Sequence, residues 1–492
     1  MGINSNQIPL YLTFDDVLLL PQHSDILPSA VETKTKFTKN LTLNLPFISA
    51  AMDTVTESKM AIAMAKSGGI GVLHRSLSPQ AQAEEVRKVK RASSIVIREP
   101  IAIDIHTPLT NAKALMKRHN ISGLPVVDED GKLLGILTSR DVKSATEQKS
   151  TVENVMTTKL ITAPENIAVE TARELMLENK IEKLPIVKDE ILVGMMTLRD
   201  ISQVDKYPLV NIDSHGHLMV AAAVGTDVST EKRVALLVEA GVDAIIIDTA
   251  HGHSQKVIDT FKTIRKEYGD LQIIVGNIAT AAAAKELIDL GVDALKVGIG
   301  PGSICTTRIV AGVGAPQLSA IQDVYSVAKN SGVPIIADGG IKNSGDAVKA
   351  LAAGASSVML GTMVAGCNES PGEQIMKDGH LYKSFRGMGS LGAMKRGSRD
   401  RYFQDHHDAD EDLESKLVPE GVEGMVSFKG DVKSVIYQMA GGLQAGMGYI
   451  GASSISEMKT QAQFVQVTAA ALRENHPHDV IITQEAPNYS GA

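Results

Sequence analysis

Residues 244–300 read AIIIDTAHGHSQKVIDTFKTIRKEYGDLQIIVGNIATAAAAKELIDLGVDALKVGIG, and this stretch decides the fold. Three short apolar runs, Ala244–Asp248, Gln272–Ile278 and Ala294–Gly300, alternate with two amphipathic stretches, Ser254–Lys266 and Ala281–Leu290. Near-continuous apolar runs of this length are typical of strands that are buried on both faces. The amphipathic stretches have the periodicity of helices that cover such strands. The stretch therefore predicts a parallel sheet in which a helix connects each strand to the next.

The same alternation of strands and helices extends over most of the chain. Two further amphipathic stretches lie at Thr230–Glu239 and Ser344–Ala353. The five remaining apolar runs are Pro46–Ala51, Gly69–Leu73, Met219–Gly225, Pro334–Gly339 and Ser357–Gly361. Eight strands that alternate with helices predict an α/β protein built on a closed (β/α)8 TIM barrel. An open, doubly wound sheet is the structural alternative, because alternation alone does not show that a sheet closes.

The composition is that of a globular protein and argues against several functional classes. The 492 residues carry a formal net charge of −8. Specific nucleic-acid binding is not expected without a basic stripe, and no apolar run is long enough to cross a membrane. The two cysteines, Cys305 and Cys367, form no CxxC pair, which argues against a disulfide framework or a thiolate zinc site. With no signal peptide visible, we expect a cytoplasmic protein.

An insertion with an internal repeat interrupts the alternation between the second and third predicted strands. It spans residues 94–206, between barrel segments 1–93 and 207–492, and its halves cover about 94–150 and 151–206. The matching stretches are ISGLPVV at 121–127 and IEKLPIV at 181–187, GILTSRD at 135–141 and GMMTLRD at 194–200, and predicted helices at Asn111–Arg118 and Glu170–Glu178. Pro125 and Pro185 are 60 residues apart, and Thr138 and Thr197 are 59 apart. A nearly constant offset indicates one structural unit present twice.

This repeat resembles a tandem pair of cystathionine-β-synthase (CBS) motifs, which form a Bateman domain. The resemblance implies a regulatory unit that binds adenine or guanine nucleotides of the ATP or GTP type. The implied contacts are Thr138 and Asp141 in the first half and Thr197 and Asp200 in the second. The carboxylates would accept hydrogen bonds from a ribose diol. Alternatively, these residues cap the helix after each strand and bind nothing.

The motif richest in chemistry follows the sixth predicted barrel strand, where barrel enzymes place catalytic loops. It reads GIGPGSICTTR at residues 298–308. Its glycines allow unusual backbone angles and a close approach to a ligand, and Ser303 adds a hydroxyl and an amide suited to phosphate. A thiol in such a polar turn is a candidate nucleophile, so we predict this role for Cys305. Cys367 is expected to be an inert buried thiol.

The loop around Cys305 resembles the catalytic loop of the IMP dehydrogenase and GMP reductase family. The resemblance extends through FDDVLLLP at residues 14–21 and AMDTVT at 51–56 to the C-terminal tail, and so covers nearly the whole chain. In that family the cysteine attacks C2 of the purine ring. The resemblance therefore implies that Cys305 forms a covalent adduct with inosine 5'-monophosphate (IMP) on the way to xanthosine 5'-monophosphate (XMP).

The same resemblance implies the residues that hold the nucleotide. Many family members have Tyr where this chain has Phe385, so one phosphate hydrogen bond is expected to be missing. Each glycine pair could be an ordinary strand-to-helix turn, but several matches in one order favour the binding site. The implied substrate residues are Ser303, Asp338, Gly339, Gly340, Gly361, Thr362, Phe385, Arg386, Gly387, Met388, Gly389 and Glu420.

NAD and a potassium ion are the implied cofactors. No Rossmann GxGxxG fingerprint is present, so NAD would bind at the top of the barrel, against Asp248, Asn277, Gly298, Ile299 and Gly300. Main-chain carbonyls of Gly300, Gly302 and Cys305 would bind potassium together with Glu474, Asn475 and His476 of a neighbouring subunit. Shared ligands imply a homotetramer, and pairing into octamers through the CBS unit is left open. His251 and His253 are interpreted as loop residues rather than metal ligands.

The motif DRYF at residues 400–403 separates the functional alternatives. The resemblance makes Arg401 the group that activates water, with Tyr402 beside it and Thr307 in the same proton path; a surface ion pair is the plain alternative. The motif lies in a stretch of about 380–430 that we expect to be a mobile flap, with an acidic run at 405–415. GMP reductase, expected to lack both the insertion and the Arg-Tyr pair, is the nearest rival function. A catalytically silent nucleotide sensor is the second rival.

Overall fold

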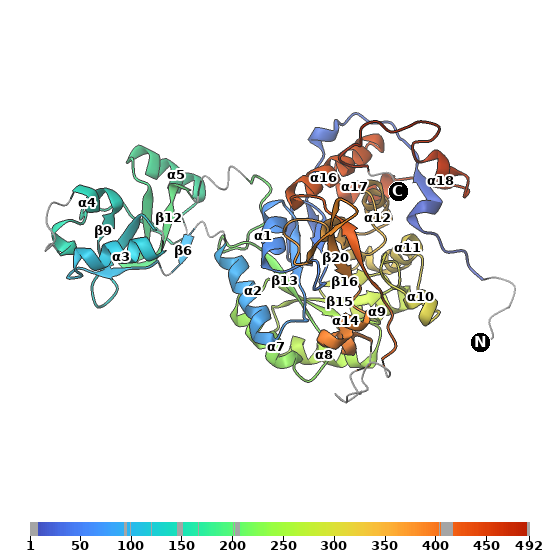
Figure 1. Cartoon of the computed structure of the whole chain (residues 1–492), viewed down its shortest axis with the longest axis horizontal. Coiled ribbons are helices and arrows are strands. Elements are labelled where there is room, and N and C mark those ends of the chain that lie inside the picture. The colour runs from blue at the N-terminus through green and yellow to red at the C-terminus, as the bar shows by residue number, and fades with distance from the viewer. Residues whose placement is uncertain are drawn as a thin grey trace. The chain divides into compact units, whose positions relative to one another are not determined.

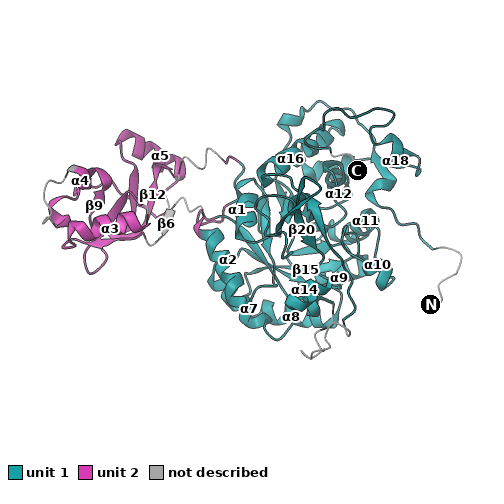
Figure 2. Cartoon of the chain, viewed as in Figure 1, with its two compact units in different colours: residues 1–90, 209–211, 218–492 teal, residues 91–208, 212–217 magenta. Residues whose placement is uncertain are grey.

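The computed structural model describes residues 8–92, 96–98, 100–119, 121–144, 151–165, 167–199, 201, 207–402, 404 and 417–489. The chain divides into two compact units, which Figure 2 distinguishes by colour. The first unit consists of Met1–Lys90, Leu209–Asn211 and Leu218–Ala492, and the second of Arg91–Pro208 and Ile212–His217. The predicted insertion at 94–206 falls within the second unit.

The first unit is a closed barrel of eight parallel strands, which confirms the predicted TIM barrel and excludes the open sheet. The strand order around the barrel is β13-β14-β15-β16-β17-β18-β4-β5, and the ring closes where β5 pairs with β13. The strands are β4 (Phe47–Ser49), β5 (Ile70–Leu73), β13 (Val220–Val224), β14 (Ala244–Asp248), β15 (Gln272–Ile278), β16 (Ala294–Val297), β17 (Ile335–Asp338) and β18 (Ser357–Leu360).

Helices surround the barrel strands, as Figure 1 shows. Nearly every barrel-strand residue is buried, because the interior side chains meet one another and the outer ones meet the helices. The helices between barrel strands are α1 (Ser58–Lys66), α2 (Pro79–Arg91), α7 (Thr230–Glu239), α8 (Gln255–Glu267), α9 (Ala281–Leu290), α10 (Thr307–Val310), α11 (Gln317–Ala328) and α12 (Ser344–Ala352). After β18 come α13 (Thr362–Ala365), α16 (Val432–Tyr449), α17 (Ile455–Gln461) and α18 (Ala471–Glu474).

The second unit contains two halves of the same construction, each with its own small core. The first half has β7 (Ile103–Asp104), β8 (Gly123–Val127) and β9 (Leu133–Thr138) with α3 (Leu109–His119) and α4 (Ser139–Ser144). The second has β10 (Ala163–Pro164), β11 (Lys183–Lys188) and β12 (Ile191–Thr197) with α5 (Val169–Glu178), and β6 (Val96–Arg98) extends its sheet. Gly123 pairs with Thr138 and Lys183 with Thr197, and each hairpin has an irregularity at the equivalent place. The sequence repeat therefore corresponds to a structural repeat.

Shorter elements complete the first unit. The segment predicted as a flap contains β20 (His380–Arg386), β21 (Glu423–Ser427), α14 (Leu391–Ala393), η4 (Met394–Ser398) and η5 (Arg399–Tyr402), and β19 (Gln374–Lys377) joins its sheet. Antiparallel pairs form between β1 (Val17–Leu19) and β22 (Phe464–Gln466), and between β2 (Thr35–Lys36) and β3 (Thr42–Leu43). The acidic run at 405–415 and Phe403 lie outside the described residues. Among the helices of the described chain, none has the length and apolarity that a membrane span requires.

Candidate active site

The loop after β16 presents Cys305 at the C-terminal end of the barrel. Strand β16 ends at Val297 rather than at the predicted Gly300, because Gly298 and Gly300 have φ angles of 151° and 82°. A Cβ on Gly298 would clash with the carbonyl oxygen of Asp338. The main-chain amide of Cys305 donates to Gly302 O at 3.1 Å, and Cys305 Sγ lies 3.2 Å from Thr307 Oγ1. The loop thus holds a partly exposed thiol beside a hydroxyl.

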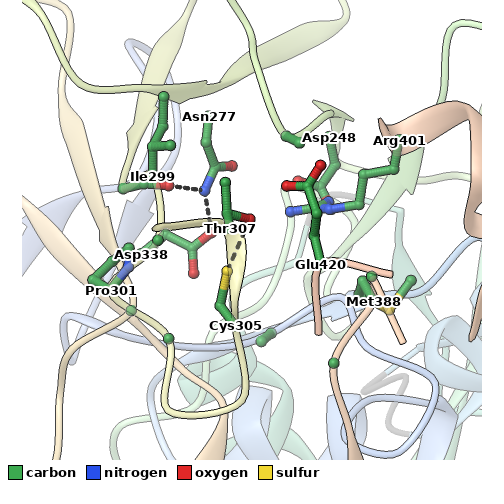
Figure 3. Close-up of a pocket in the computed structure, with 18 of the residues that line it drawn as sticks. Asp248, Asn277, Ile299, Pro301, Cys305, Thr307, Asp338, Met388, Arg401 and Glu420 are labelled. Atoms are coloured by element: carbon green, nitrogen blue, oxygen red, sulfur yellow. Dashed lines mark hydrogen bonds and ion pairs between the residues drawn. The ribbon is translucent and has the colours of Figure 1, made fainter. Parts of the chain in front are cut away.

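Cys305 lines a cavity into which segments distant in sequence converge, shown in Figure 3. An adjoining cavity of about 380 Å³ shares part of its wall. Together they hold every predicted substrate residue except Arg386, and all the predicted catalytic residues. The lining includes Asp248, Asn277, Gly298, Ile299, Gly300, Gly302, Cys305, Thr307, Asp338, Gly339, Gly387, Met388, Gly389, Arg401, Tyr402 and Glu420 in the first cavity, and Ser303, Gly340, Gly361, Thr362 and Phe385 in the second.

Three buried charged side chains that line the first cavity form consecutive ion pairs. The Arg401 guanidinium forms a buried ion pair with Asp248, and Lys296 Nζ lies 2.8 Å from the other Asp248 oxygen. Burial would raise the pKa of Asp248, but Arg401 and then Lys296 outweigh it and hold this pKa at about 2. Burial would likewise lower the pKa of Arg401, but the Asp248 carboxylate outweighs it and raises that pKa. Asp248 is therefore a carboxylate and Arg401 a cation.

Lys296 also contacts two further polar residues that line the cavity. Its Nζ lies 2.6 Å from Asp338 Oδ2 and bonds to Asn277 Oδ1. The Asn277 amide donates to Asp338 Oδ2 at 2.9 Å and to Gly298 O at 2.6 Å. Within the described residues the second carboxylate oxygen of Asp338 has no hydrogen-bond partner, so it can bind a ligand, and Asn277 is fixed in place by both of its polar atoms.

The second cavity has the groups of a phosphate site. Ser303 Oγ and Thr362 Oγ1 lie 2.6 Å apart, and Lys429 lines the same wall. The para carbon of the Phe385 ring would lie 3.8 Å from a Cβ on Gly361. The Arg386 side chain is already committed, since its Nε donates to both oxygens of Asp53 at 3.0 Å. The main-chain amide of Arg386 is also bonded, since it donates to Thr54 Oγ1 at 3.3 Å.

Glu420 and Tyr402 also line the first cavity, and Figure 3 shows Glu420 across it from Asp338. Glu420 O accepts a hydrogen bond from Thr306 N at 3.0 Å, which ties the segment before β21 to the Cys305 loop. A Cβ on Gly389 would lie 2.7 Å from the Tyr402 ring, so the turn after β20 needs glycine for space. Burial raises the pKa of Tyr402 to about 12, although Arg401 opposes it. Tyr402 is thus a neutral hydrogen-bonding phenol beside a cation.

Several predicted residues lie away from this site. In α18 and after it, Asn475 N donates to Ala471 O at 2.8 Å, and His476 Nδ1 lies 3.0 Å from Tyr489 Oη. Their proposed potassium role, and that of Glu474, requires a second subunit. In the second unit, Asp141 Oδ2 accepts from Thr138 N at 2.7 Å and Thr138 Oγ1 accepts from Asp141 N at 3.4 Å, which is the capping arrangement given above as the alternative. Asp200 lies outside the described residues.

The residues suited to bind a metal are main-chain groups rather than side chains. In the described part of the chain, His, Cys, Asp and Glu form no cluster of three that could hold a metal ion. His253 Nε2 instead lies 2.7 Å from Glu286. The carbonyl oxygens of Gly300 and Cys305 accept no hydrogen bond from the described residues, and they belong to the loop predicted to hold potassium. Carbonyl oxygens without partners fit a hard monovalent cation.

Three charged residues in or next to the site were not predicted from the sequence. Lys296 lies inside an apolar strand. Lys429 is distant in sequence from the other residues that line its cavity. Arg75, just after β5, pairs with Asp400 at 2.6 Å. A lysine within a buried strand was a usable signal, because such a charge requires partners. Lys429 and Arg75 carried no comparable signal.

Comparisons with known proteins agree with this geometry. The model of the IMP dehydrogenase / GMP reductase domain matches residues 11–478. The inosine-5'-monophosphate dehydrogenases of Halalkalibacterium halodurans and Aquifex aeolicus are each 53% identical, with 97% of this chain covered in both cases and 98% and 97% of theirs. That of Staphylococcus aureus is 52% identical, over 97% of this chain and 98% of its own.

A solved structure corrects one argument made from sequence. A cysteine-to-alanine variant of GMP reductase from Trypanosoma brucei, in complex with guanosine 5'-monophosphate, is 42% identical with a TM-score of 0.85. It covers 97% of this chain, so it must match most of the insertion, and 100% of its own chain is matched. The expectation that a GMP reductase lacks the insertion is therefore wrong, and the insertion does not separate the two activities. By the domain match and these relatives, the chain belongs to the IMP dehydrogenase / GMP reductase family.

Proposed function

We propose that this protein is an IMP dehydrogenase, which converts IMP, NAD⁺ and water to XMP, NADH and a proton. The observation that carries the proposal is the pair of adjoining cavities that bring together the Cys305 thiol, a phosphate site and the buried Arg401–Asp248 pair. The relatives reported above at 52–53% identity carry the dehydrogenase name, which favours this function over the reductase.

The substrate would be held by its ends so that its purine carbon meets the sulfur. The hydroxyls of Ser303 and Thr362 and the amides of the glycine turns take the phosphate, and Asp338 takes the ribose hydroxyls. Glu420 holds the purine edge across the cavity from Asp338. This fixed pose lets the Cys305 thiolate add to C2, and fixed geometry is what makes such an addition fast.

Oxidation and hydrolysis would then use the same side of the cavity, beside Asp248, one after the other. Asp248, Asn277 and the Gly298–Gly300 turn line the same cavity and would hold NAD⁺, which would supply the acceptor for the hydride that leaves C2. The product of this step is a thioimidate between Cys305 and the purine. Arg401 occupies the Asp248 side of the cavity, so the cofactor and Arg401 exclude each other there. Arg401 enters for the hydrolytic step after NADH leaves.

Arg401 would activate water as a cation rather than by taking its proton from the start. Paired with Asp248, its guanidinium can hold a water against the thioimidate carbon and stabilise the charge that develops. The hydroxyls of Thr307 and Tyr402 give the proton a path away from the water. Tyr402 can serve because burial keeps its phenol protonated well above neutral pH.

Assembly and regulation belong to the same proposal. Potassium would be bound by Gly300, Gly302 and Cys305 with Glu474, Asn475 and His476 of a neighbouring subunit, in a homotetramer. The second unit would be a CBS pair that binds ATP- or GTP-type nucleotides, since its two halves repeat in both sequence and hairpin register. Its position in the chain, inside the barrel sequence, suits a regulatory role.

The test compares two substrate pairs on the full-length chain. NADH formation from IMP and NAD⁺ is measured beside NADPH oxidation with GMP. The proposal predicts turnover in the first assay and at most a trace in the second. The reverse result would show that the protein is a GMP reductase. This is the second candidate, because the chain is similar in structure to the GMP reductase of Trypanosoma brucei. Nucleotide binding without turnover in either assay would establish the silent sensor.

A further inference from the structure

We propose that Arg75 is a positioning residue that latches the Arg401 segment into the active site through its ion pair with Asp400. The inference rests on the proposed function, because it concerns how Arg401 takes the cofactor's place beside Asp248. Arg75 does not contact the reacting groups. It acts by holding Asp400, the residue that precedes Arg401 in the chain.

The pair is buried and well formed. Arg75 Nη1 lies 2.6 Å and 2.7 Å from the two oxygens of Asp400. The two side chains are 4% and 5% exposed, so neither is an ordinary surface partner. Asp400 and Arg401 are consecutive in η5, and they pair with the ends of two different barrel strands, β5 and β14. The latch therefore anchors the residue directly before Arg401.

The barrel provides space for this pair at Gly225, just after β13. A Cβ on Gly225 would lie about 2.5 Å from Arg75 Nη1 and closer still to Asp400 Oδ2. The φ angle of Gly225 is outside the left-handed region, so its backbone does not need glycine. The absence of a side chain there is explained by the room that the latch takes.

Asp400 fits among three charged residues, Arg75, Asp227 and Arg233, which we call the socket. Without Asp400, Arg75 in the socket has no close carboxylate partner. Besides Asp400, the ion-pair partner of Arg75 within the described chain is Asp227, at the longer distance of 4.0 Å. Arg233 adds a second buried cation nearby and is held by Leu77 O at 3.0 Å and Gln82 Oε1 at 2.8 Å. With η5 withdrawn, Arg75 would keep only the more distant Asp227 as an ion-pair partner within the described chain. A buried cation that loses its partner is costly, so the socket favours the closed position.

This preference has a defined consequence for the reaction. Cofactor and η5 compete for the space beside Asp248, so a weaker latch must shift the balance toward the cofactor. Loss of the latch should slow hydrolysis, which needs Arg401, and spare hydride transfer, which needs the flap open. It should also tighten cofactor binding to the covalent enzyme, which a general loss of stability would not do.

The experiment uses Arg75→Gln, Arg75→Lys, Asp400→Asn and Gly225→Ala in the full-length chain, with rapid mixing of IMP and NAD⁺. Arg265→Gln is the matched control, because Arg265 forms an ion pair with Asp293 away from the cavity. We expect Arg75→Gln, Asp400→Asn and Gly225→Ala to keep the NADH burst rate within about twofold and to slow the steady state about tenfold or more. Excess NAD⁺ should inhibit them at lower concentration, and Arg75→Lys should be milder.

Two results would overturn the latch. In the first, the burst rate and the steady-state rate fall by the same factor in the latch variants, which is the pattern of a general structural defect and the pattern that Arg265→Gln would show if it damaged the fold. In the second, inhibition by NAD⁺ is unchanged in both Arg75→Gln and Asp400→Asn. Asp400→Asn changes only the flap side of the pair, so it still tests the latch if Arg75→Gln fails to fold. A wild-type chain that gives no NADH burst with IMP would instead overturn the proposed function, and the latch with it.

Discussion

The regions around Cys305 and Cys367 place the same residue type in opposite settings. Cys305 lies in the loop after β16, partly exposed in a cavity and 3.2 Å from a hydroxyl. Cys367, after α13, is fully buried in the core, and burial raises the pKa of its thiol to about 12. Reactivity therefore follows from position at the strand ends and from polar neighbours, and not from the residue itself.

Replacing each cysteine should separate the two regions most strongly. Cys305→Ala should lower turnover by about 10⁴-fold or more, because no other group can form the adduct, and should change IMP affinity only a few-fold. Cys367→Ala should leave turnover within about twofold and cost about 1 kcal/mol of stability, since it opens a small gap in the core. Steady-state assays, IMP titration and thermal unfolding check both. Equal losses of turnover in the two variants would end the distinction.

Removing the Arg401 cation, which lines the same cavity as Cys305, tests what the cavity adds to the thiol. Arg401→Ala should slow hydrolysis by on the order of a hundredfold or more, while the first NADH burst persists because Cys305 still forms the adduct. Rapid-quench kinetics would then show the covalent enzyme accumulating. Loss of the burst itself would mean that Arg401 acts before hydride transfer, against its assignment to the second step.

The buried thiol should reveal itself through the pH dependence of stability. Because the pKa of Cys367 is raised in the folded state, its thiol stabilises the fold below pH 9, and this contribution is lost as pH rises from about 9 toward 12. The wild-type chain should therefore lose about 1 kcal/mol more than Cys367→Ala between pH 8 and pH 10. Unfolding midpoints at the two pH values measure the difference. A constant difference would show that Cys367 ionises as an exposed thiol does.

The smallest effect is expected at the phosphate end of the reactive cavity. The Phe385 ring points its para carbon toward Gly361, so Phe385→Tyr would place a hydroxyl at the phosphate turn. One added hydrogen bond should lower KM for IMP by about two- to tenfold with kcat little changed. Steady-state kinetics over a range of IMP concentrations decides this. A raised KM would mean that the hydroxyl crowds the phosphate instead.

The fold could be predicted because its signal is local. Ala244–Asp248, Gln272–Ile278 and Thr230–Glu239 have the predicted bounds in the structure, since burial on both faces gives a continuous apolar run. Strand β16 was predicted three residues too long, because glycine turns and strand ends look alike in an apolar sequence. Closure of the barrel depends on the pairing of β5 with β13 across the inserted unit, which no local pattern contains.

The site could be predicted in part, through resemblance and loop chemistry. Cys305 stood out by its glycine-rich polar loop, whereas Arg401 came from family resemblance alone. The ion pairs that hold the site were missed, because Arg75 and Asp400 are 325 residues apart. Only the closed barrel brings such partners together, so their pairing had no sequence signature.

The most direct test is mass spectrometry of the enzyme quenched during turnover with IMP and NAD⁺, followed by digestion and mapping of modified peptides. The account predicts a purine nucleotide attached to the peptide that contains Cys305, and none on the peptide that contains Cys367. An enzyme that turns over at full rate with both thiols unmodified at every quench time would contradict it.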